Sequence, residues 1–362
     1  MVEDNSGLTA MNVSEMVRHL SGAYTALCRK SIAFRSFPSV MLWGPPGVGK
    51  SQGVREIAES VSDATGRHVE ITDVRLLLFN PVDLRGIPTT NEDRTLAVWL
   101  KPKIFQMDES PDVVNFLFLD EISAAAQSIQ AAAYQITLDR CVGEHKLPEN
   151  CIVIAAGNRV TDKSVAYNMP KALANRLLHL EIKGDPVAWH GWALRKGIHP
   201  FVTGYLDYNP VALMRFDPTA TSLAFPTPRS WEMASNILNT VSDEIGAVYP
   251  LLAGCVGREA AASLQTWAEL YRTLPSAEEI FAGGAAEHPA EAERRIALRS
   301  ALAAYARRHP ERTGLDNSIA YACGLPWEFR SALLHDYACI PALVPLLRQN
   351  KTYQAALEHG LR

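Results

Sequence analysis

A short apolar segment that ends at a glycine-rich loop constrains this chain more than any other feature. Residues 39–43 read Ser-Val-Met-Leu-Trp, and they are followed by Gly44, Pro45, Pro46, Gly47, Val48, Gly49, Lys50 and Ser51. This order fits the pattern G-x-x-x-x-G-K-S of a phosphate-binding loop. Glycines let the backbone turn tightly, so that successive N–H groups point at phosphate oxygens, and the next helix adds partial positive charge. The pattern predicts a buried strand, a nucleotide-binding loop and a helix.

Four side chains outside the glycines have predicted roles in this chemistry. We expect Lys50 to reach the β- and γ-phosphates and Ser51 to bind Mg²⁺. Four apolar residues, 116–119, precede Asp120 and Glu121. Asp120 would complete the Mg²⁺ shell through water, and Glu121 would polarise the attacking water. A buried strand that merely ends in exposed acids gives the same local pattern, but its position after the phosphate loop favours the functional interpretation.

A third apolar run also ends in a polar residue. Residues 155–158 read Ala-Ala-Gly-Asn. The amide of Asn158 can hydrogen-bond both the γ-phosphate and the water that attacks it. Gly-Asn also favours turns regardless of chemistry, and the spacing of Asn158 after the acidic pair favours the functional role.

Further apolar runs alternate with helical patterns along the first half of the chain. The runs cover residues 69–71, 115–119, 151–155 and 177–180. Helical patterns lie between most of them, for example over 50–61 and 124–138. This alternation predicts an α/β fold with a parallel sheet covered by helices on both faces. An amphipathic helix over 14–29, capped by Asn12 or Ser14, would precede it.

The strand pattern fades after Pro186. Helical patterns follow, and residues 282–285, Ala-Gly-Gly-Ala, indicate a linker before a strong helical pattern over 290–308. We predict a large nucleotide-binding domain over 1–186, with insertions at about 80–101 and 140–148, a helical region over 187–285 and a helical C-terminal extension over 286–362.

Composition excludes several classes of protein. The 362 residues are 48% hydrophobic and 20% charged, so a disordered or fibrous chain is excluded. The net charge of −4 does not predict a nucleic-acid coat, although a basic groove stays compatible with it. We expect no membrane span, because no apolar run of about 18 residues occurs. The acidic start Met1–Asn5 and six scattered cysteines indicate a cytoplasmic setting.

The phosphate loop, the Asp120–Glu121 pair and Asn158 together resemble the AAA+ ATPases of the MoxR family. This branch is also related to the AAA modules of midasin and dynein. The resemblance covers roughly residues 15–270, and the loop and the acidic pair are its most specific parts. It implies a P-loop αβα sandwich with a parallel five-stranded sheet in the order 5-1-4-3-2. It also implies an all-α lid and a homo-oligomer, normally a ring of six subunits.

Two arginines match the family by position. Arg176, in the segment Lys171–Leu177, resembles the arginine finger that enters the neighbouring subunit's site. A guanidinium there would neutralise charge as the γ-phosphate leaves. Arg229, in Thr227–Ser230, resembles the lid arginine called sensor 2, which bonds the phosphates in cis. Either side chain could instead form an ordinary surface ion pair.

The two insertions match the family pattern as well. Residues 83–86, Asp-Leu-Arg-Gly, begin the first insertion, and the second would be a hairpin before the Asn158 strand. In related proteins these loops face the axis of the ring or a partner. Candidate contact residues are Trp99, Leu100, Lys101, His145 and Lys146. The alternative is that both segments are ordinary surface loops.

The resemblance implies an ATPase that uses ATP and Mg²⁺ and converts hydrolysis into movement of the lid. It would remodel or activate a protein partner, often one with a von Willebrand factor A domain. Two other classes stay open. One is a nucleic-acid motor like the AAA+ subunits of McrB-type restriction systems, which the net charge disfavours weakly. The other is a scaffold that binds ATP without hydrolysing it, against which Glu121, Asn158 and Arg176 argue.

Overall fold

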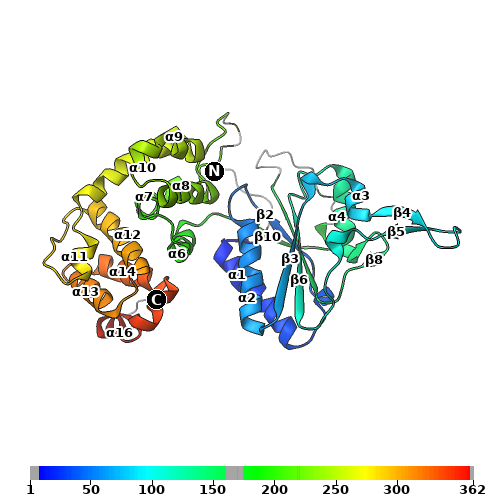
Figure 1. Ribbon diagram of the computed structural model, residues 1–362, viewed down its shortest axis with the longest axis horizontal. Helices are drawn as coiled ribbons and strands as arrows, with labels where there is room; N and C mark the ends of the chain where they lie inside the picture. The colour runs from blue at the N-terminus through cyan, green and yellow to red at the C-terminus, as the bar shows by residue number, and fades with distance from the viewer. Residues whose placement is uncertain (1–7, 160–168, 170–173, 218, 220, 359–362) are drawn as a thin grey trace. The chain divides into compact units, whose positions relative to one another are not determined.

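The computed structural model describes residues 8–159, 169, 174–217, 219 and 221–358. The acidic start Met1–Asn5 and residues 171–173 of the segment before Arg176 lie outside this range. The described residues form two compact units, Met1–Lys183 and Gly184–Arg362 (Figure 1). Each unit has a hydrophobic core of its own.

The first unit is built on a parallel sheet with the strand order β1-β10-β2-β9-β6-β3. The strands are β1 (Ala10–Met11), β2 (Val40–Trp43), β3 (His68–Arg75), β6 (Val113–Asp120), β9 (Cys151–Gly157) and β10 (Leu178–Ile182). The strands expected from the sequence follow the predicted order 5-1-4-3-2. The prediction of five strands is wrong by one, because β1 adds a sixth at the edge beside β10. The strand β1 has only two residues, so it contains no apolar run that could be recognised in the sequence.

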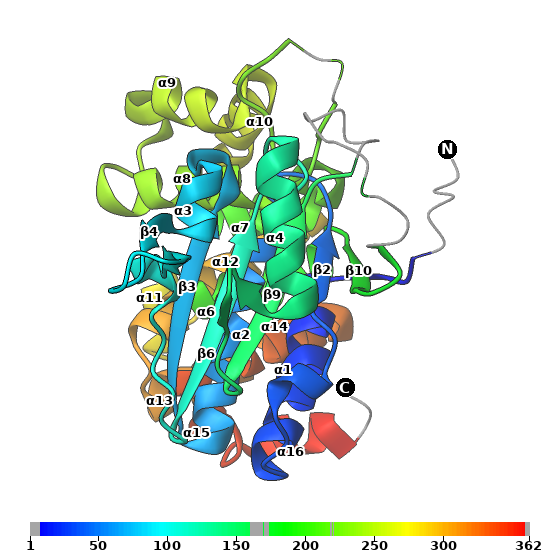
Figure 2. The ribbon, with the colours of Figure 1, turned by 90° about the vertical axis from the view of Figure 1, so that its right-hand side faces the viewer.

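Helices cover both faces of this sheet (Figures 1 and 2). On one side lie α1 (Val13–Arg29) and α2 (Lys50–Thr65), and on the other lies α4 (Gln127–Asp139). The α4 side forms a core in which Ile129 and Ile136 pack with Leu117 of β6. Asn12 caps α1, because its Oδ1 accepts from the Glu15 N–H at 2.8 Å and the Glu15 carboxylate accepts from the Asn12 N–H.

The two insertions form hairpins that contact each other. The first contains α3 (Pro81–Arg85), β4 (Ile87–Thr90) and β5 (Ala97–Leu100), and it lies between η2 (Leu76–Leu78) and η3 (Lys103–Phe105). The second contains β7 (Cys141–Val142) and β8 (His145–Lys146). The Trp99 N–H donates to Glu144 Oε1 at 3.0 Å. His145 Nε2 lies 2.7 Å from the Trp99 carbonyl oxygen. The insertions that the sequence presents separately therefore form one hydrogen-bonded surface element.

The second unit is helical throughout its described part. Its helices are α6 (Pro186–Lys196), α7 (Pro200–Tyr208), α8 (Pro228–Thr240), α9 (Ile245–Val256), α10 (Arg258–Ala268), α11 (Ala277–Phe281), α12 (Ala292–Arg308), α13 (Arg312–Ala322), α14 (Trp327–Ala338), α15 (Val344–Leu347) and α16 (Lys351–Glu358). Short 3-10 segments across both units are η1 (Phe34–Ser36), η5 (Pro210–Leu213), η6 (Glu269–Thr273) and η7 (Pro341–Leu343).

Two hydrophobic clusters hold this unit together, and α12 contributes to both. Ala297 belongs to the cluster around Trp231, and its neighbour Leu298 belongs to the cluster around Leu333. The predicted lid and extension therefore share a helix, and a boundary between them at 285/286 stays a prediction.

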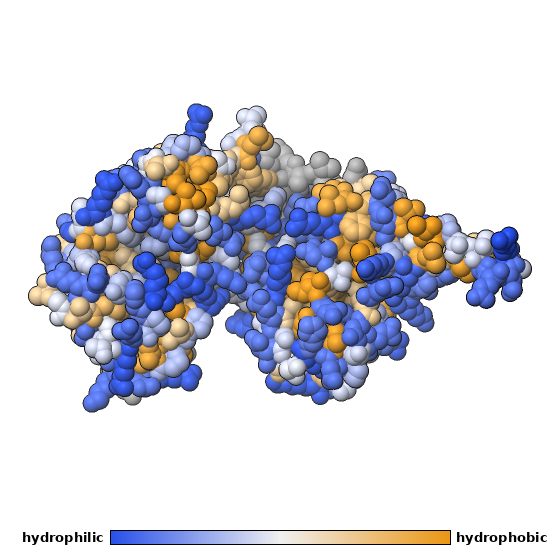
Figure 3. Space-filling view, viewed as in Figure 1, coloured by the Kyte–Doolittle hydropathy of each residue, from blue (hydrophilic) through white to orange (hydrophobic). Residues whose placement is uncertain are grey.

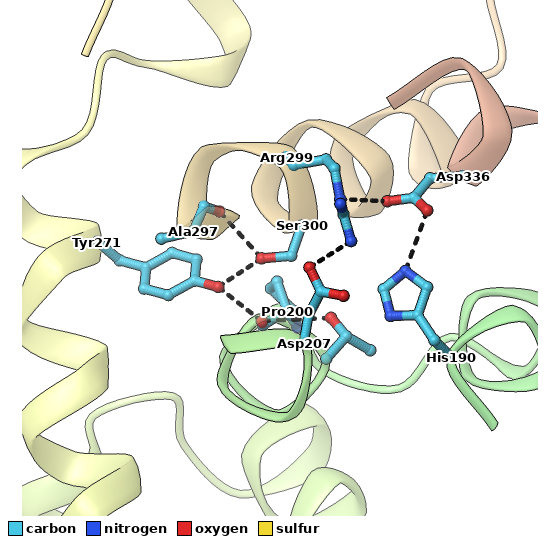
Figure 4. Close-up of polar contacts among 9 residues, drawn as sticks. His190, Pro200, Asp207, Tyr271, Ala297, Arg299, Ser300 and Asp336 are labelled. Atoms are coloured by element: carbon cyan, nitrogen blue, oxygen red, sulfur yellow. Dashed lines mark hydrogen bonds and ion pairs between the residues drawn. The ribbon is translucent and has the colours of Figure 1, made fainter. Parts of the chain in front are cut away.

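A buried group of charged side chains links four helices of this unit (Figure 4). Arg299 of α12 forms ion pairs with Asp207 of α7 and, at 2.9 Å from its Nε, with Asp336 of α14. His190 Nε2 of α6 lies 3.0 Å from the other oxygen of Asp336, which is only 2% exposed. Burial disfavours the charge of Arg299, but the Asp336 and Asp207 carboxylates outweigh it and hold the guanidinium pKa above its ordinary value.

Replacing Arg299 with alanine tests this group. We expect Arg299→Ala to lower the free energy of unfolding by about 3–5 kcal/mol, because two carboxylates stay buried without their cation. Urea denaturation measures the change. The control is Arg308→Ala on the same helix, whose exposed side chain should change stability by less than about 0.5 kcal/mol. Equal stability of the two variants would show that the buried charges do not hold the helices together.

Candidate nucleotide site

The predicted phosphate loop connects β2 to α2, and its backbone depends on glycine. Gly49 has φ of 110°, a conformation that other residues rarely adopt. At Gly44 a Cβ atom would lie 2.5 Å from the carbonyl oxygen of Ile182, so β10 leaves no room for a side chain. Val48 anchors the loop, because its side chain is 3% exposed. Pro45, Pro46 and Gly47 complete the turn, with φ of 76° at Gly47.

Lys50 is the first residue of α2 and directs its ammonium back into the loop. Its Nζ donates to the carbonyl oxygens of Gly44 at 2.6 Å and Pro45 at 3.1 Å. It also donates to Asn158 Oδ1 at 3.1 Å. The residue is 8% exposed, so the charge is held among backbone and amide oxygens rather than in bulk water. A phosphate in the loop would meet this ammonium directly.

Ser51 and Asp120 meet beside the loop. The Ser51 hydroxyl donates to Asp120 Oδ2 at 2.9 Å, which joins the start of α2 to the end of β6. Hydroxyl and carboxylate oxygens are hard donors, and Mg²⁺ in phosphate sites uses a few such ligands and keeps several waters. The chemistry of this donor pair therefore fits a magnesium ion.

Glu121 follows Asp120 in a left-handed backbone conformation, with φ of 61°. Its N–H donates to Asp120 Oδ1 at 2.9 Å, and the Ile122 N–H donates to the Ala156 carbonyl at 3.0 Å. These bonds hold a conformation that costs a residue with a Cβ atom of the order of 1–3 kcal/mol. The turn leaves the Glu121 side chain exposed at the end of the strand, beside Asp120.

Asn158 directly follows β9. This strand pairs with β2, which leads into the phosphate loop. Asn158 Oδ1 accepts from Lys50, and the Asn158 N–H donates to Ser123 Oγ at 2.9 Å. A Cβ at Gly157 would lie 2.8 Å from that same oxygen, so the glycine lets the two segments approach. Ser123 was not singled out from the sequence. Its position two residues after Glu121 is the only local signal.

Lys50, Ser51, Asp120 and Asn158 are thus brought together at the carboxyl ends of β2, β6 and β9. Neither predicted arginine forms a hydrogen bond or ion pair with this group in the described part of the chain. Arg176 has an exposed side chain and makes no hydrogen bond or ion pair within the described part of the chain. Arg229 lies in the second unit, exposed, in the first turn of α8, where Thr227 and Ser230 form a capping box. The roles of both arginines stay predictions.

The family match agrees with this geometry. Residues 39–179 match the family described as "ATPase family associated with various cellular activities (AAA)". The matched range contains the loop, the acidic pair, Asn158 and Arg176. Over these residues the first unit resembles that family, whose members are described as ATPases.

The chain is also similar to a curated chaperone. Chaperone MoxR1 of Mycobacterium tuberculosis is 26% identical over 170 residues, which are 46% of this chain and 41% of MoxR1. The chain spans about two fifths of the length of this curated relative. With the family match, the likeness supports an AAA+ ATPase of MoxR type. None of the helices in the described ranges combines the length and apolar composition that crossing a bilayer requires.

Several solved structures are similar at low identity. PCH-2 of Caenorhabditis elegans has a TM-score of 0.36 and 13% identity, covering 72% of this chain and 69% of that one. A point mutant of RuvB from Thermotoga maritima has a TM-score of 0.35 and 13% identity, covering 93% and 90%. A putative ATPase from Cytophaga hutchinsonii has a TM-score of 0.31 and 18% identity, covering 69% and 72%. At these TM-scores the likenesses carry no argument about the site.

Replacing Lys50 tests the position of its ammonium in the loop. We expect Lys50→Ala to weaken ATP binding at least tenfold, since a charge-assisted hydrogen bond contributes about 1.5–3 kcal/mol. Titration calorimetry measures the affinity. Lys30→Ala, at the exposed end of α1, is the control and should bind ATP normally. Unchanged affinity in Lys50→Ala would remove the loop from the nucleotide site.

Proposed function

We propose that this chain forms a ring and uses Mg²⁺-dependent ATP hydrolysis to remodel or activate a protein partner. The observation that carries the proposal is the convergence of Lys50, Ser51, Asp120 and Asn158 at one edge of the sheet. Within the MoxR type, we place the chain in the branch related to midasin and dynein.

The chemistry follows from the side chains at this edge. Lys50 exchanges its carbonyl partners for phosphate oxygens, and the loop N–H groups bind the remaining oxygens. Ser51 and Asp120 would hold Mg²⁺, which when bound neutralises charge on the β- and γ-phosphate oxygens. Glu121 polarises the attacking water, and Asn158 orients that water against the γ-phosphate.

Arg176 completes the site of a neighbouring subunit. Its exposed guanidinium, without a described partner, supports a role between subunits rather than within one. Such a residue stabilises the charge of the transition state and contributes roughly 10³–10⁵ in rate where it acts in other nucleotidases. Arg229 would bind the phosphates in its own subunit and connect them to the lid. Hydrolysis then depends on assembly into a ring, which we expect to contain six subunits.

The surface of the first insertion and of the η2 segment before it favours a protein partner over nucleic acid. Leu78 is 77% exposed, Leu96 is 66% exposed, and Ile87 and Leu100 are also largely exposed. Figure 3 shows apolar residues gathered over this part of the first unit. Exposed apolar side chains suit protein contacts, whereas a nucleic-acid surface is dominated by basic side chains. The name of MoxR1 as a chaperone also supports this choice.

Stimulation of hydrolysis identifies the partner class. A protein captured by the Glu121→Gln variant with ATP, and tested first among von Willebrand factor A proteins, should raise the ATPase rate of the native chain. Stimulation by DNA or RNA instead, lost steeply as salt increases, would show a nucleic-acid motor.

Replacing Glu121 separates binding from hydrolysis. We expect Glu121→Gln to keep ATP affinity and lose about 10²–10⁴ in phosphate release, because the amide cannot polarise water as a carboxylate does. Glu109→Gln, an exposed residue before β6, is the matched control and should hydrolyse ATP at the native rate. Native turnover by Glu121→Gln would exclude the proposed role.

Mixing variants tests Arg176. Arg176→Ala alone should lose hydrolysis, and so should Lys50→Ala alone. A mixture should regain activity where the arginine of a Lys50→Ala subunit meets the intact loop of an Arg176→Ala subunit. Phosphate release from the mixture measures this recovery. A mixture that stays inactive, although both variants assemble, contradicts action between subunits.

A further inference from the structure

His179 lies on β10, the strand that follows Arg176, beside the strand that leads into the phosphate loop. In the register of these strands His179 pairs with Met41 and Glu181 with Trp43. His179 and Trp43 therefore project from the same face of the sheet, one row apart. Their rings are stacked, with an angle of 16° between the planes.

Both ring nitrogens of His179 have a defined partner. Trp43 Nε1 donates to Nδ1 at 2.8 Å, and Nε2 lies 2.7 Å from the Ala174 carbonyl oxygen. An indole N–H can only donate and a carbonyl oxygen can only accept, so the hydrogen of the neutral ring must be on Nε2. The imidazole thus connects Trp43, next to Gly44, with Ala174, close to Arg176.

Ala174 is the first residue of the turn that carries Arg176. Its carbonyl accepts from His179 and also from the Leu177 N–H at 3.2 Å, which closes the turn over residues 174–177. Leu177 is buried at 8% exposure in the core beneath α4. Ala174 and Leu177, on either side of Arg176, are therefore held by these contacts, while the Arg176 side chain is exposed.

A second contact joins β10 to the segment that follows Asn158. Glu181, 1% exposed, forms an ion pair with Arg159, the residue directly after Asn158. Trp43 precedes the loop and Arg159 follows Asn158, and both contact side chains of β10. The strand after Arg176 is thus bonded to two segments that would contact the γ-phosphate.

From these contacts we infer that His179 is a positioning residue, which holds the turn of Arg176 in register with the phosphate loop of its own subunit. The inference rests on the proposed function, in which Arg176 serves the neighbouring site. Each subunit would then present its arginine from a turn that His179 connects to its own loop. Misplacing a reacting group by about 1 Å can cost a factor of 10² in rate, so the loss of one such bond is measurable.

The test replaces each end of the connection. His179→Asn is too short to reach both partners, and Trp43→Phe keeps an aromatic ring without the donor. We expect ATP affinity to stay native and turnover of the assembled ring to fall about 10–100-fold in His179→Asn. The double variant should lose no more than His179→Asn alone, since the two changes break one connection. His68→Asn, at the exposed start of β3, is the matched control.

Mixing shows in which direction His179 acts. His179→Asn subunits keep an intact loop, so mixing with Lys50→Ala subunits, whose Arg176 turn is native, should restore turnover. If the mixture of Arg176→Ala and Lys50→Ala recovers turnover but the mixture of His179→Asn and Lys50→Ala does not, the inference about His179 is wrong. The proposed action of Arg176 between subunits would then still stand. If neither mixture recovers, the proposed action of Arg176 between subunits fails first. Native turnover by His179→Asn would also overturn the inference. Should His179→Asn not assemble, Trp43→Phe undergoes the same mixing with the same outcomes.

Discussion

The hydrogen bonds of the Lys50 ammonium connect the phosphate loop with the end of β9. A buried cation needs oxygen partners, and here they come from the loop itself and from the strand beside it. This is possible only because β2 and β9 are adjacent and parallel, so that their carboxyl ends open at the same edge. The strand order and the position of Asn158 thus bring an amide oxygen within reach of this one charged group.

Motifs with local chemistry could be predicted from the sequence. The phosphate loop, the acids after β6 and the amide after β9 each combine a short apolar run with a polar end. Such runs reveal a parallel sheet because its strands are buried on both faces. The strand β1 and the contacts of His179 are features that the sequence did not predict. Both depend on which residues lie opposite each other across strands, and a single sequence does not contain that register.

Contacts in the insertions and in the second unit could not be predicted from the sequence either. Nothing local indicates that Trp99 and Glu144 form a hydrogen bond, because they come from hairpins far apart in the chain. Likewise, Arg299 sits among ordinary helical residues, and its two carboxylate partners come from α7 and α14. Buried ions of this kind are poor sources of stability compared with apolar packing, but they tolerate few alternative arrangements. They connect α12 with α6, α7 and α14 within that unit.

The left-handed backbone at Glu121 lowers the stability of the fold but places a carboxylate at the end of β6. A glycine at that position would adopt φ of 61° at little cost and would make the fold more stable, yet it would carry no acid. Under the proposed function, the chain accepts local strain at the residue that would polarise the attacking water. Thermal robustness and turnover would then favour different residues at this single position.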